Sequence, residues 1–323
     1  MMAPQIIFGT AGLGMEQTAF QDARSVTNLL ETLRDLGISR LDTGARYPPL
    51  HPGRSEELLG ETREISRDFV IDTKVFTDTK TDGSGDLRRE AIAKSVEGSL
   101  QRLQRPEGVN ILYIHRADPA TPLKEQIQGF AEQITKGHCK AWGVSNVPPP
   151  VLEEMLQLCE TNGWPKPSWY QGTYNVMSRG METKLLAILR NHGMKFVAFW
   201  ALASGFLTGN FINGNHEGTR LGDDNPLGKH FQKMYGSAEV AESMRKFDIE
   251  TRAEGLPPLE VAIRWIFHHS RLTDDDAVLL GASRVEQLVE SVALASKGPL
   301  PEKVVLLAER LWEGVADIRG DII

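Results

Sequence analysis

Three polar residues that can take part in proton transfer follow three successive predicted strands, at the point where each strand ends. They are Asp42, Lys74 and His115, and Tyr47 lies in the loop that follows Asp42. The carboxyl ends of the strands of a parallel barrel open onto one face, so we expect these four side chains to share a pocket. A carboxylate, an ammonium group, an imidazole and a phenol in one pocket predict proton transfer coupled to a second chemical step.

Short β-rich runs alternate with amphipathic helix patterns along the whole chain. Eight runs begin near Gln5, Ile38, Phe69, Val109, Cys139, Ser168, Lys195 and Asp276. Between them, apolar residues recur at helical spacing and give each helix one buried stripe, as in Val26, Leu29, Leu30 and Leu33. Eight strand–helix units predict one α/β domain over residues 1–323, folded as a (β/α)8 TIM barrel.

The seventh unit is longer than the others. It runs for about 80 residues from Lys195 to Asp276, and seven glycines lie between Gly205 and Gly236. A long segment at the catalytic end of a barrel is typical of a lid or belt that closes over a ligand. Arg220 and Lys233 are its cations that we expect to meet a phosphate or an acidic substrate.

Two other folds compete with this prediction. An open Rossmann sheet is suggested by the glycines between Gly9 and Gly14, which follow a strand and precede a helix, but their spacing is not GxGxxG. A metal-dependent hydrolase barrel would need paired histidines or carboxylates at strand ends. His268 and His269 instead lie on a predicted helix and His51 in a loop, so we expect no metal.

Composition limits the class of protein. The 323-residue chain is 41% hydrophobic and 24% charged, and its net charge of −7 argues against nucleic-acid binding, which needs a basic surface. No apolar run approaches a membrane span, and Cys139 and Cys159 form no disulfide or metal motif, which favours the cytoplasm. The sequence does not reveal the oligomeric state, and a homodimer is one outcome compatible with it.

Ordered motifs along almost the whole chain resemble one family. They include residues 41–47 (LDTGARY), 55–60 (SEELLG), 73–74 (TK), 99–103 (SLQRL), 112–115 (LYIH), 143–146 (GVSN), 170–175 (YQGTYN), 204–209 (SGFLTG), 267–270 (FHHS) and 281–288 (GASRVEQL). This set is similar to the aldo-keto reductases, with a particular likeness to their aflatoxin-aldehyde-reductase branch. The resemblance implies a (β/α)8 barrel that binds NADPH and reduces aldehydes or ketones.

The four polar residues fit that chemistry. A carbonyl oxygen gains negative charge as hydride arrives, so a nearby proton donor lowers the barrier. We expect Tyr47 to be this donor and the charge of Lys74 to lower its pKa from an ordinary value of about 10. Asp42 would keep Lys74 charged and oriented, and a neutral His115 would align the carbonyl oxygen.

The resemblance also implies cofactor contacts. Nicotinamide would be bound by Ser145, Asn146 and Gln171, and its ring would stack on Tyr174. The backbone of four residues would hold the pyrophosphate, namely Leu202, Ser204, Gly205 and Leu207, with Arg220 as a further cofactor contact. Ser283 and Arg284 would bind the adenosine 2′-phosphate, and Gln287 and Glu290 would flank the adenine.

The chain departs from the family pattern at several positions. Ser291 replaces an asparagine that commonly contacts adenine, Trp200 replaces a small polar residue, and Asn110 replaces an aspartate. An alternative from another functional class also stays open, because potassium-channel β-subunits resemble these reductases but serve as regulatory, cofactor-binding partners. The intact set of four polar residues favours an enzyme.

Overall fold

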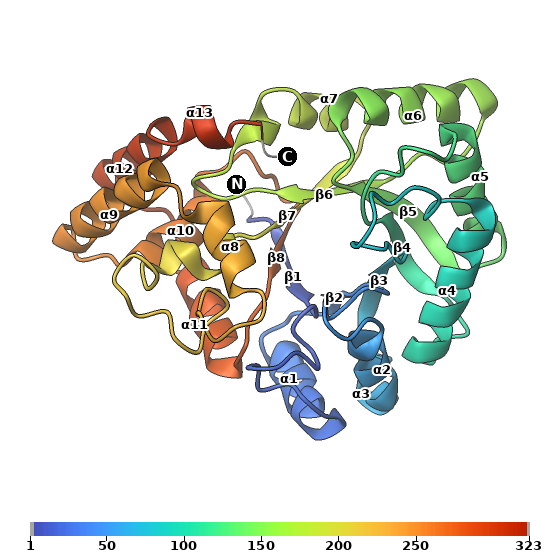
Figure 1. Cartoon of the computed structure of the whole chain (residues 1–323), viewed down its shortest axis with the longest axis horizontal. Helices are drawn as coiled ribbons and strands as arrows, with labels where there is room; N and C mark the ends of the chain where they lie inside the picture. The colour runs from blue at the N-terminus through green and yellow to red at the C-terminus, as the bar shows by residue number, and fades with distance from the viewer. Residues whose placement is uncertain (1–2, 322–323) are drawn as a thin grey trace.

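The computed structural model describes residues 3–321. Eight parallel strands close a barrel in chain order, as predicted, and Figure 1 shows them in a ring with the helices outside. They are β1 (Gln5–Gly9), β2 (Arg40–Asp42), β3 (Val70–Lys74), β4 (Val109–Ile114), β5 (Cys139–Ser145), β6 (Trp169–Thr173), β7 (Lys195–Phe199) and β8 (Ala277–Leu280). Strand β8 pairs with β1, with Ala277 beside Gln5, and this closure excludes an open Rossmann sheet.

The helices follow the predicted pattern of one buried stripe each. Between the strands lie α1 (Ala23–Asp35), α2 (Arg54–Glu61), α3 (Arg63–Ser66), α4 (Arg89–Leu103), α5 (Leu123–Thr135), α6 (Pro149–Asn162), η1 (Gly180–Glu182) and α7 (Leu185–Asn191). After β8 come α11 (Val285–Ala295), α12 (Glu302–Glu313) and α13 (Ala316–Arg319). In α1, Asp22 caps the first turn by accepting from the backbone nitrogen of Ser25 at 2.8 Å, which stabilises the helix start.

Side chains alternate between the two faces of each strand, so the core has one layer inside the barrel and one between the strands and the helices. Inside the barrel, Ile7, Val197 and Ala277 form a small buried cluster. Outside, Phe196 lies edge-on against Tyr174, whose ring in turn contacts Trp265 of a surrounding helix. Successive strand residues point to opposite faces, so Val197 and then Phe199 face the barrel interior.

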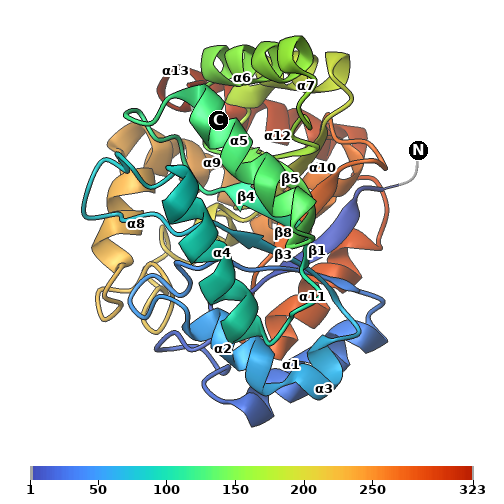
Figure 2. The same cartoon turned by 90° about the vertical axis from the view of Figure 1, so that its right-hand side faces the viewer.

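The long seventh unit is more ordered than the sequence suggested. After β7 it contains η2 (Ala203–Thr208), α8 (Gly228–Tyr235), α9 (Ala238–Ala253) and α10 (Pro258–His268), so only residues 209–227 form an irregular segment. Figure 2 shows α8 on the side of the barrel where the loops after β2 and β3 lie.

The irregular segment reaches across to the loop after β1. There Gln17 donates to the Asp224 backbone oxygen at 3.1 Å and accepts from the Asn225 amide at 2.8 Å. These hydrogen bonds join the middle of the seventh unit to the first unit of the barrel. We call residues 205–236 the belt.

Candidate active site

The structure brings the four predicted catalytic side chains together. Lys74, at the end of β3, donates from Nζ to Oδ2 of Asp42, at the end of β2, and to the Thr43 carbonyl at 2.9 Å. Its Nζ also lies 4.9 Å from the centre of the Tyr47 ring. The Tyr47 hydroxyl is 3.4 Å from Nε2 of His115, which directly follows β4. The carboxyl ends of three strands therefore position one connected site.

Lys74 and Asp42 form a buried ion pair, with 2% and 1% of their side chains exposed. Burial lowers the pKa of Lys74, but Asp42 and Tyr47 oppose it and the net pKa lies above the ordinary value. Lys74 is therefore a fixed ammonium. Leaving either charge without its partner would be costly, because a buried unpaired charge is poorly solvated.

Tyr47 differs from the sequence prediction in one respect. Burial raises the pKa of Tyr47 above its usual value, and the charge of Lys74 opposes this shift without reversing it. The expected net decrease is therefore wrong for this structure, since burial disfavours the phenolate more than one cation favours it. The phenol is protonated at neutral pH, as a proton donor must be.

His115 is neutral, as predicted. Burial, followed by the positive charges of Lys74, Arg46 and Arg116, lowers the pKa of His115 to about 3. Its Nδ1 is buried without a partner among the described residues. Nε2 of His115 lies beside the Tyr47 hydroxyl. A protonated Nε2 and the phenol can therefore both donate to one ligand oxygen.

Sequence reasoning missed Asp72 and Arg40, which form a layer of polar residues below the site together with Gln171 and Asn110. Nε2 of Gln171, on β6, donates to the second carboxylate oxygen of Asp42 at 2.5 Å. Deeper in the barrel, Asp72 accepts from Arg40 at 2.8 Å and from Asn110 at 2.8 Å. Side chains along a strand point alternately inward and outward, and this pattern places Asp42, Asp72 and Lys74 on inward faces. The same pattern in the sequence could have been used to predict this layer. Asn110 therefore supports Asp72 and does not enter the site.

The residues after β5 stand beside the four catalytic candidates. Ser145 is buried at the strand end, and the exposed Asn146 has a left-handed backbone with φ of 54°. Nδ2 of Asn146 donates to the His115 carbonyl at 3.0 Å and to the Ser145 hydroxyl at 3.1 Å. These bonds tie the expected nicotinamide contacts to the position of His115.

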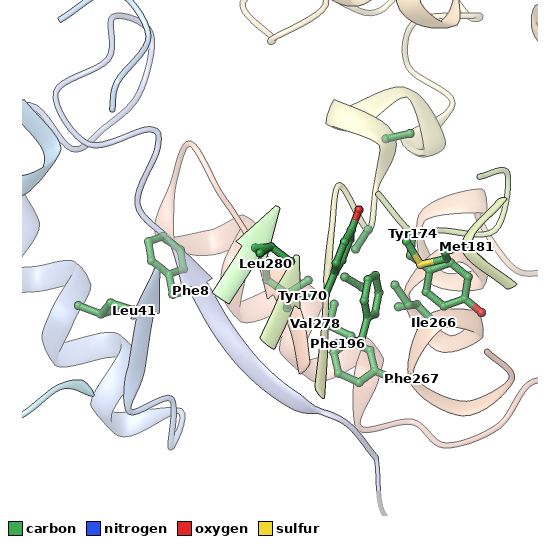
Figure 3. Packing of buried hydrophobic residues seen from close by; sticks show 14 of the residues in the cluster. Phe8, Leu41, Tyr170, Tyr174, Met181, Phe196, Ile266, Phe267, Val278 and Leu280 are labelled. Atoms are coloured by element: carbon green, nitrogen blue, oxygen red, sulfur yellow. The ribbon is translucent and has the colours of Figure 1, made fainter. Parts of the chain in front are cut away.

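The predicted stacking role of Tyr174 is corrected by its position. Tyr174 is fully buried, and Figure 3 shows it in the hydrophobic core near Met181 and Ile266. Its hydroxyl donates to Glu182 at 2.6 Å, so neither face of the ring is open to a ligand. Phe199 instead combines an inward register at the end of β7 with a partly exposed ring. Phe199 is therefore a half-buried aromatic residue at the carboxyl end of β7.

Backbone conformation in η2 fits a phosphate-binding role. Ala203, Ser204 and Gly205 have successive positive φ values of 50°, 58° and 96°. Within this turn, the Ala203 and Gly205 nitrogens donate to the Trp200 and Leu202 carbonyls at 2.8 and 2.9 Å. The Ser204 hydroxyl is buried without a partner among the described residues, and a Cβ added to Gly205 would meet open space. Leu202 is partly exposed and Leu207 is buried, so their backbones frame this turn.

The predicted adenosine end lies between β8 and α11. The Gln287 side-chain oxygen accepts from the backbone nitrogen and the hydroxyl of Ser283, both at 2.9 Å. Arg284, the residue before α11, and Glu290 are exposed, and Arg284 forms no ion pair with any described residue. Ser291 donates back to the Gln287 carbonyl at 2.8 Å. A free guanidinium at a helix start is well placed for an anion.

The two belt cations occupy different environments. Arg220 is partly exposed, its guanidinium lies 5.6 Å from the Phe231 ring, and its charge lowers the pKa of Tyr47 against the larger effect of burial. It forms no ion pair within residues 3–321. Lys233 is exposed on α8. Arg220 is therefore the belt cation whose charge acts on Tyr47.

His268, His269 and the two cysteines have structural environments. His268, on α10, pairs with the Ala295 carbonyl at 2.7 Å, and His269 accepts from the Leu300 backbone at 2.7 Å. Cys139 and Cys159 are buried free thiols. In the described part of the chain, three or more metal-binding side chains do not gather at any point. None of the helices in that part is both long and apolar enough to cross a bilayer.

A closed parallel barrel with a buried ion pair, a phenol and a neutral imidazole at its carboxyl end defines a TIM-barrel enzyme. Residues 5–313 match the sequence profile of the Aldo/keto reductase family. The chain belongs to this family, and it is an oxidoreductase, as its resemblance indicated.

Named relatives extend over most of the chain. Aflatoxin B1 aldehyde reductase member 2 from Rattus norvegicus is 31% identical, covering 98% of this chain and 86% of its own length. Aflatoxin B1 aldehyde reductase member 4 from Homo sapiens is 30% identical over 96% of this chain and 94% of its own. L-glyceraldehyde 3-phosphate reductase from Escherichia coli O157:H7 is 33% identical over 82% of this chain and 77% of its own length. Similarity to the aflatoxin aldehyde reductases is thus confirmed.

Proposed function

We propose that the protein uses NADPH to reduce aldehydes or ketones to alcohols, with Tyr47 as the general acid. The observation that carries this proposal is the position of the Tyr47 hydroxyl, 3.4 Å from a neutral His115 and beside the Lys74 ammonium group. The names of the relatives, which are reductases of aldehydes, support the substrate class.

The residues at the mouth fit a nicotinamide dinucleotide. Ser145, Asn146 and the Gln171 side-chain oxygen would bind the carboxamide, and Phe199 would support the ring. The unpartnered Ser204 hydroxyl, the open Gly205 and the backbones of Leu202 and Leu207 would receive the pyrophosphate. Arg284 with Ser283 would pair with a 2′-phosphate, because a guanidinium binds phosphate through two parallel hydrogen bonds, while Gln287 and Glu290 would flank the adenine.

The protein side of the reaction follows from the geometry. NADPH, when bound, supplies hydride to the carbonyl carbon. The N–H of His115 and the O–H of Tyr47 converge on the position of the carbonyl oxygen and stabilise its developing negative charge. Tyr47 then transfers its proton to that oxygen, and Lys74 stabilises the phenolate that remains. Asp42, held by Lys74 and Gln171, keeps the ammonium group in place.

Arg220 would give the proposed site a preference for acidic substrates. Its charge acts on Tyr47 and it has no acidic partner among the described residues, so it would pair with a carboxylate or phosphate on the substrate. We therefore assign Arg220 to the substrate end of the pocket. A contact between Arg220 and the cofactor is implied by the family resemblance alone.

Purified protein tests the proposed function directly. We expect NADPH absorbance to fall when 4-nitrobenzaldehyde is added, at a rate that depends on both reactants. A Tyr47→Phe sample prepared in the same way controls for contaminating reductases. A wild-type protein that oxidises no NADPH with any of a panel of aldehydes, ketones and dicarbonyls would contradict the proposal and favour a regulatory cofactor-binding subunit.

A further inference from the structure

Trp200 has a backbone conformation that bulky residues avoid. Its φ is 56°, in the left-handed region, where a large side chain strains the chain. The conformation is held from outside, because the Trp200 carbonyl accepts from the Asn175 amide at 2.9 Å and from the Ala203 nitrogen at 2.8 Å. Asn175 is itself fully buried. Strain that the surrounding structure maintains is often found where a side chain serves a ligand.

The indole of Trp200 lies at the barrel mouth. It packs edge-on against Phe199, with ring centres 5.3 Å apart, and against Phe231 at 6.4 Å. Phe199 faces the barrel interior, and Phe231 lies under Arg220, the cation near Tyr47. These contacts connect Trp200 to Phe199 at the end of β7 and, through Phe231 and Arg220, to the surroundings of Tyr47.

Part of the indole remains available to a ligand. Trp200 is only partly buried, and its Nε1 is neither enclosed nor hydrogen-bonded among the described residues. A planar aromatic ring could lie against the open part of this surface, since aromatic rings favour offset-stacked or edge-to-face contacts. An aliphatic ring of the same size lacks the matching electrostatic pattern.

From these observations we propose that Trp200 is a specificity-determining residue that favours aryl aldehydes over aliphatic aldehydes of the same size. The proposal rests on the proposed reductase function and names its substrate class more narrowly. Arg220 lies beyond Phe231 and would favour aryl aldehydes that carry an acidic group.

Benzaldehyde and cyclohexanecarbaldehyde provide a matched pair of probes. They have the same carbon count and a similar outline, but only benzaldehyde has an aromatic face. The kcat/KM ratio of the two is measured at saturating NADPH for the full-length wild type and for two variants. Trp200→Phe retains an aromatic surface, and Trp200→Leu replaces it with an aliphatic side chain that is closer in volume to phenylalanine than to tryptophan.

We expect Trp200→Leu to lower the benzaldehyde preference by about three- to tenfold, the range for one lost aromatic contact, and Trp200→Phe to preserve most of it. Phe211→Leu is the control, because Phe211 contacts Phe206 and His216 in the same segment. This control should keep the wild-type ratio. A merely structural Trp200 would change both kcat/KM values equally and overturn the proposal.

Thermal unfolding tests the strain separately. Trp200→Asn should unfold at a higher temperature than Trp200→Leu, because asparagine tolerates a positive φ and leucine does not. The reverse order would show that burial of an apolar side chain outweighs backbone strain at this position, and would contradict the strain on which the proposal draws. If the wild type reduces neither aldehyde, the proposed function itself fails. If the wild type is active but Trp200→Leu leaves the kcat/KM ratio unchanged, only the role of Trp200 is overturned.

Discussion

At the residue scale, each catalytic candidate depends on its neighbours for its protonation state. Burial keeps His115 neutral and Tyr47 protonated, while Asp42 keeps Lys74 charged in the same small volume. Burial disfavours the charged form of each group, and the Asp42 carboxylate favours the ammonium of Lys74 while it disfavours the phenolate of Tyr47. Proton donation by Tyr47 is the consequence that can be tested first.

Replacement of Tyr47 by phenylalanine removes only the hydroxyl. We expect kcat to fall by at least about 10²-fold, the usual contribution of a general acid, while NADPH binding is preserved. Turnover is followed by NADPH absorbance and binding by fluorescence titration of the same samples. Turnover near the wild-type value would rule out Tyr47 as the acid.

Arg220 and Lys233 form a matched pair of belt cations. Arg220→Ala should raise KM for succinic semialdehyde about tenfold and change KM for butanal little, because only the first substrate carries a carboxylate. Lys233→Ala should affect neither substrate, since Lys233 is exposed on α8. Equal losses for both aldehydes in Arg220→Ala would instead indicate a structural role.

Arg284 tests the cofactor preference. We expect Arg284→Ala to weaken NADPH binding by roughly 1.5–3 kcal/mol, the range for a charge-assisted hydrogen bond, and to leave NADH binding nearly unchanged. Isothermal titration with each cofactor measures both values. Parallel weakening of the two would show that Arg284 does not contact the 2′-phosphate.

At the element scale, the belt is the segment whose position most affects the site. It provides Gly205 of the left-handed turn and the guanidinium of Arg220, and it is joined to the loop after β1 through Gln17. Residues 209–227 have no regular helix or strand of their own. Such a segment can open for ligand exchange by breaking a few hydrogen bonds.

Hydrogen exchange can follow the belt directly. Saturating NADPH should slow exchange across residues 205–236, and Gln17→Ala should reduce that protection and speed cofactor release. Gln21→Ala is the control, because Gln21 bonds to Met15 and Thr18 within its own loop. Exchange that is unaffected by cofactor would contradict closure of the belt over the ligand.

At the scale of the whole molecule, the site affects stability as well as chemistry. The depressed pKa of His115 means that, between about pH 3 and its ordinary value near 6.5, the unfolded chain binds a proton that the folded chain does not. Its contribution to stability is therefore complete above pH 6.5 and is lost as the pH falls toward 3.

Denaturant unfolding between pH 7.5 and 4.5 tests this linkage. We expect the free energy of unfolding to fall with decreasing pH, with His115 contributing up to about 1.4 kcal/mol per pH unit. His115→Gln should show a shallower decrease because glutamine does not titrate. His51→Gln, at an exposed histidine, should keep the wild-type slope. Identical slopes for all three proteins would contradict the assignment.

The sequence by itself determined the barrel and the four catalytic candidates. Both follow from local patterns: apolar spacing defines the strands and helices, and Asp42, Lys74 and His115 lie at or just after strand ends that a parallel barrel brings to one face. Tyr47, a few residues beyond Asp42, needed no long-range information either.

Tertiary structure decided the properties that depend on distant neighbours. Tyr174 is an aromatic residue just after β6, yet packing against Phe196 and Trp265 buries it and leaves Phe199 at the mouth. The net rise in the pKa of Tyr47 likewise reflects burial by the surrounding chain, which no local motif records. Burial and orientation are collective results of the closed barrel, so they became visible only when all eight strands were in place.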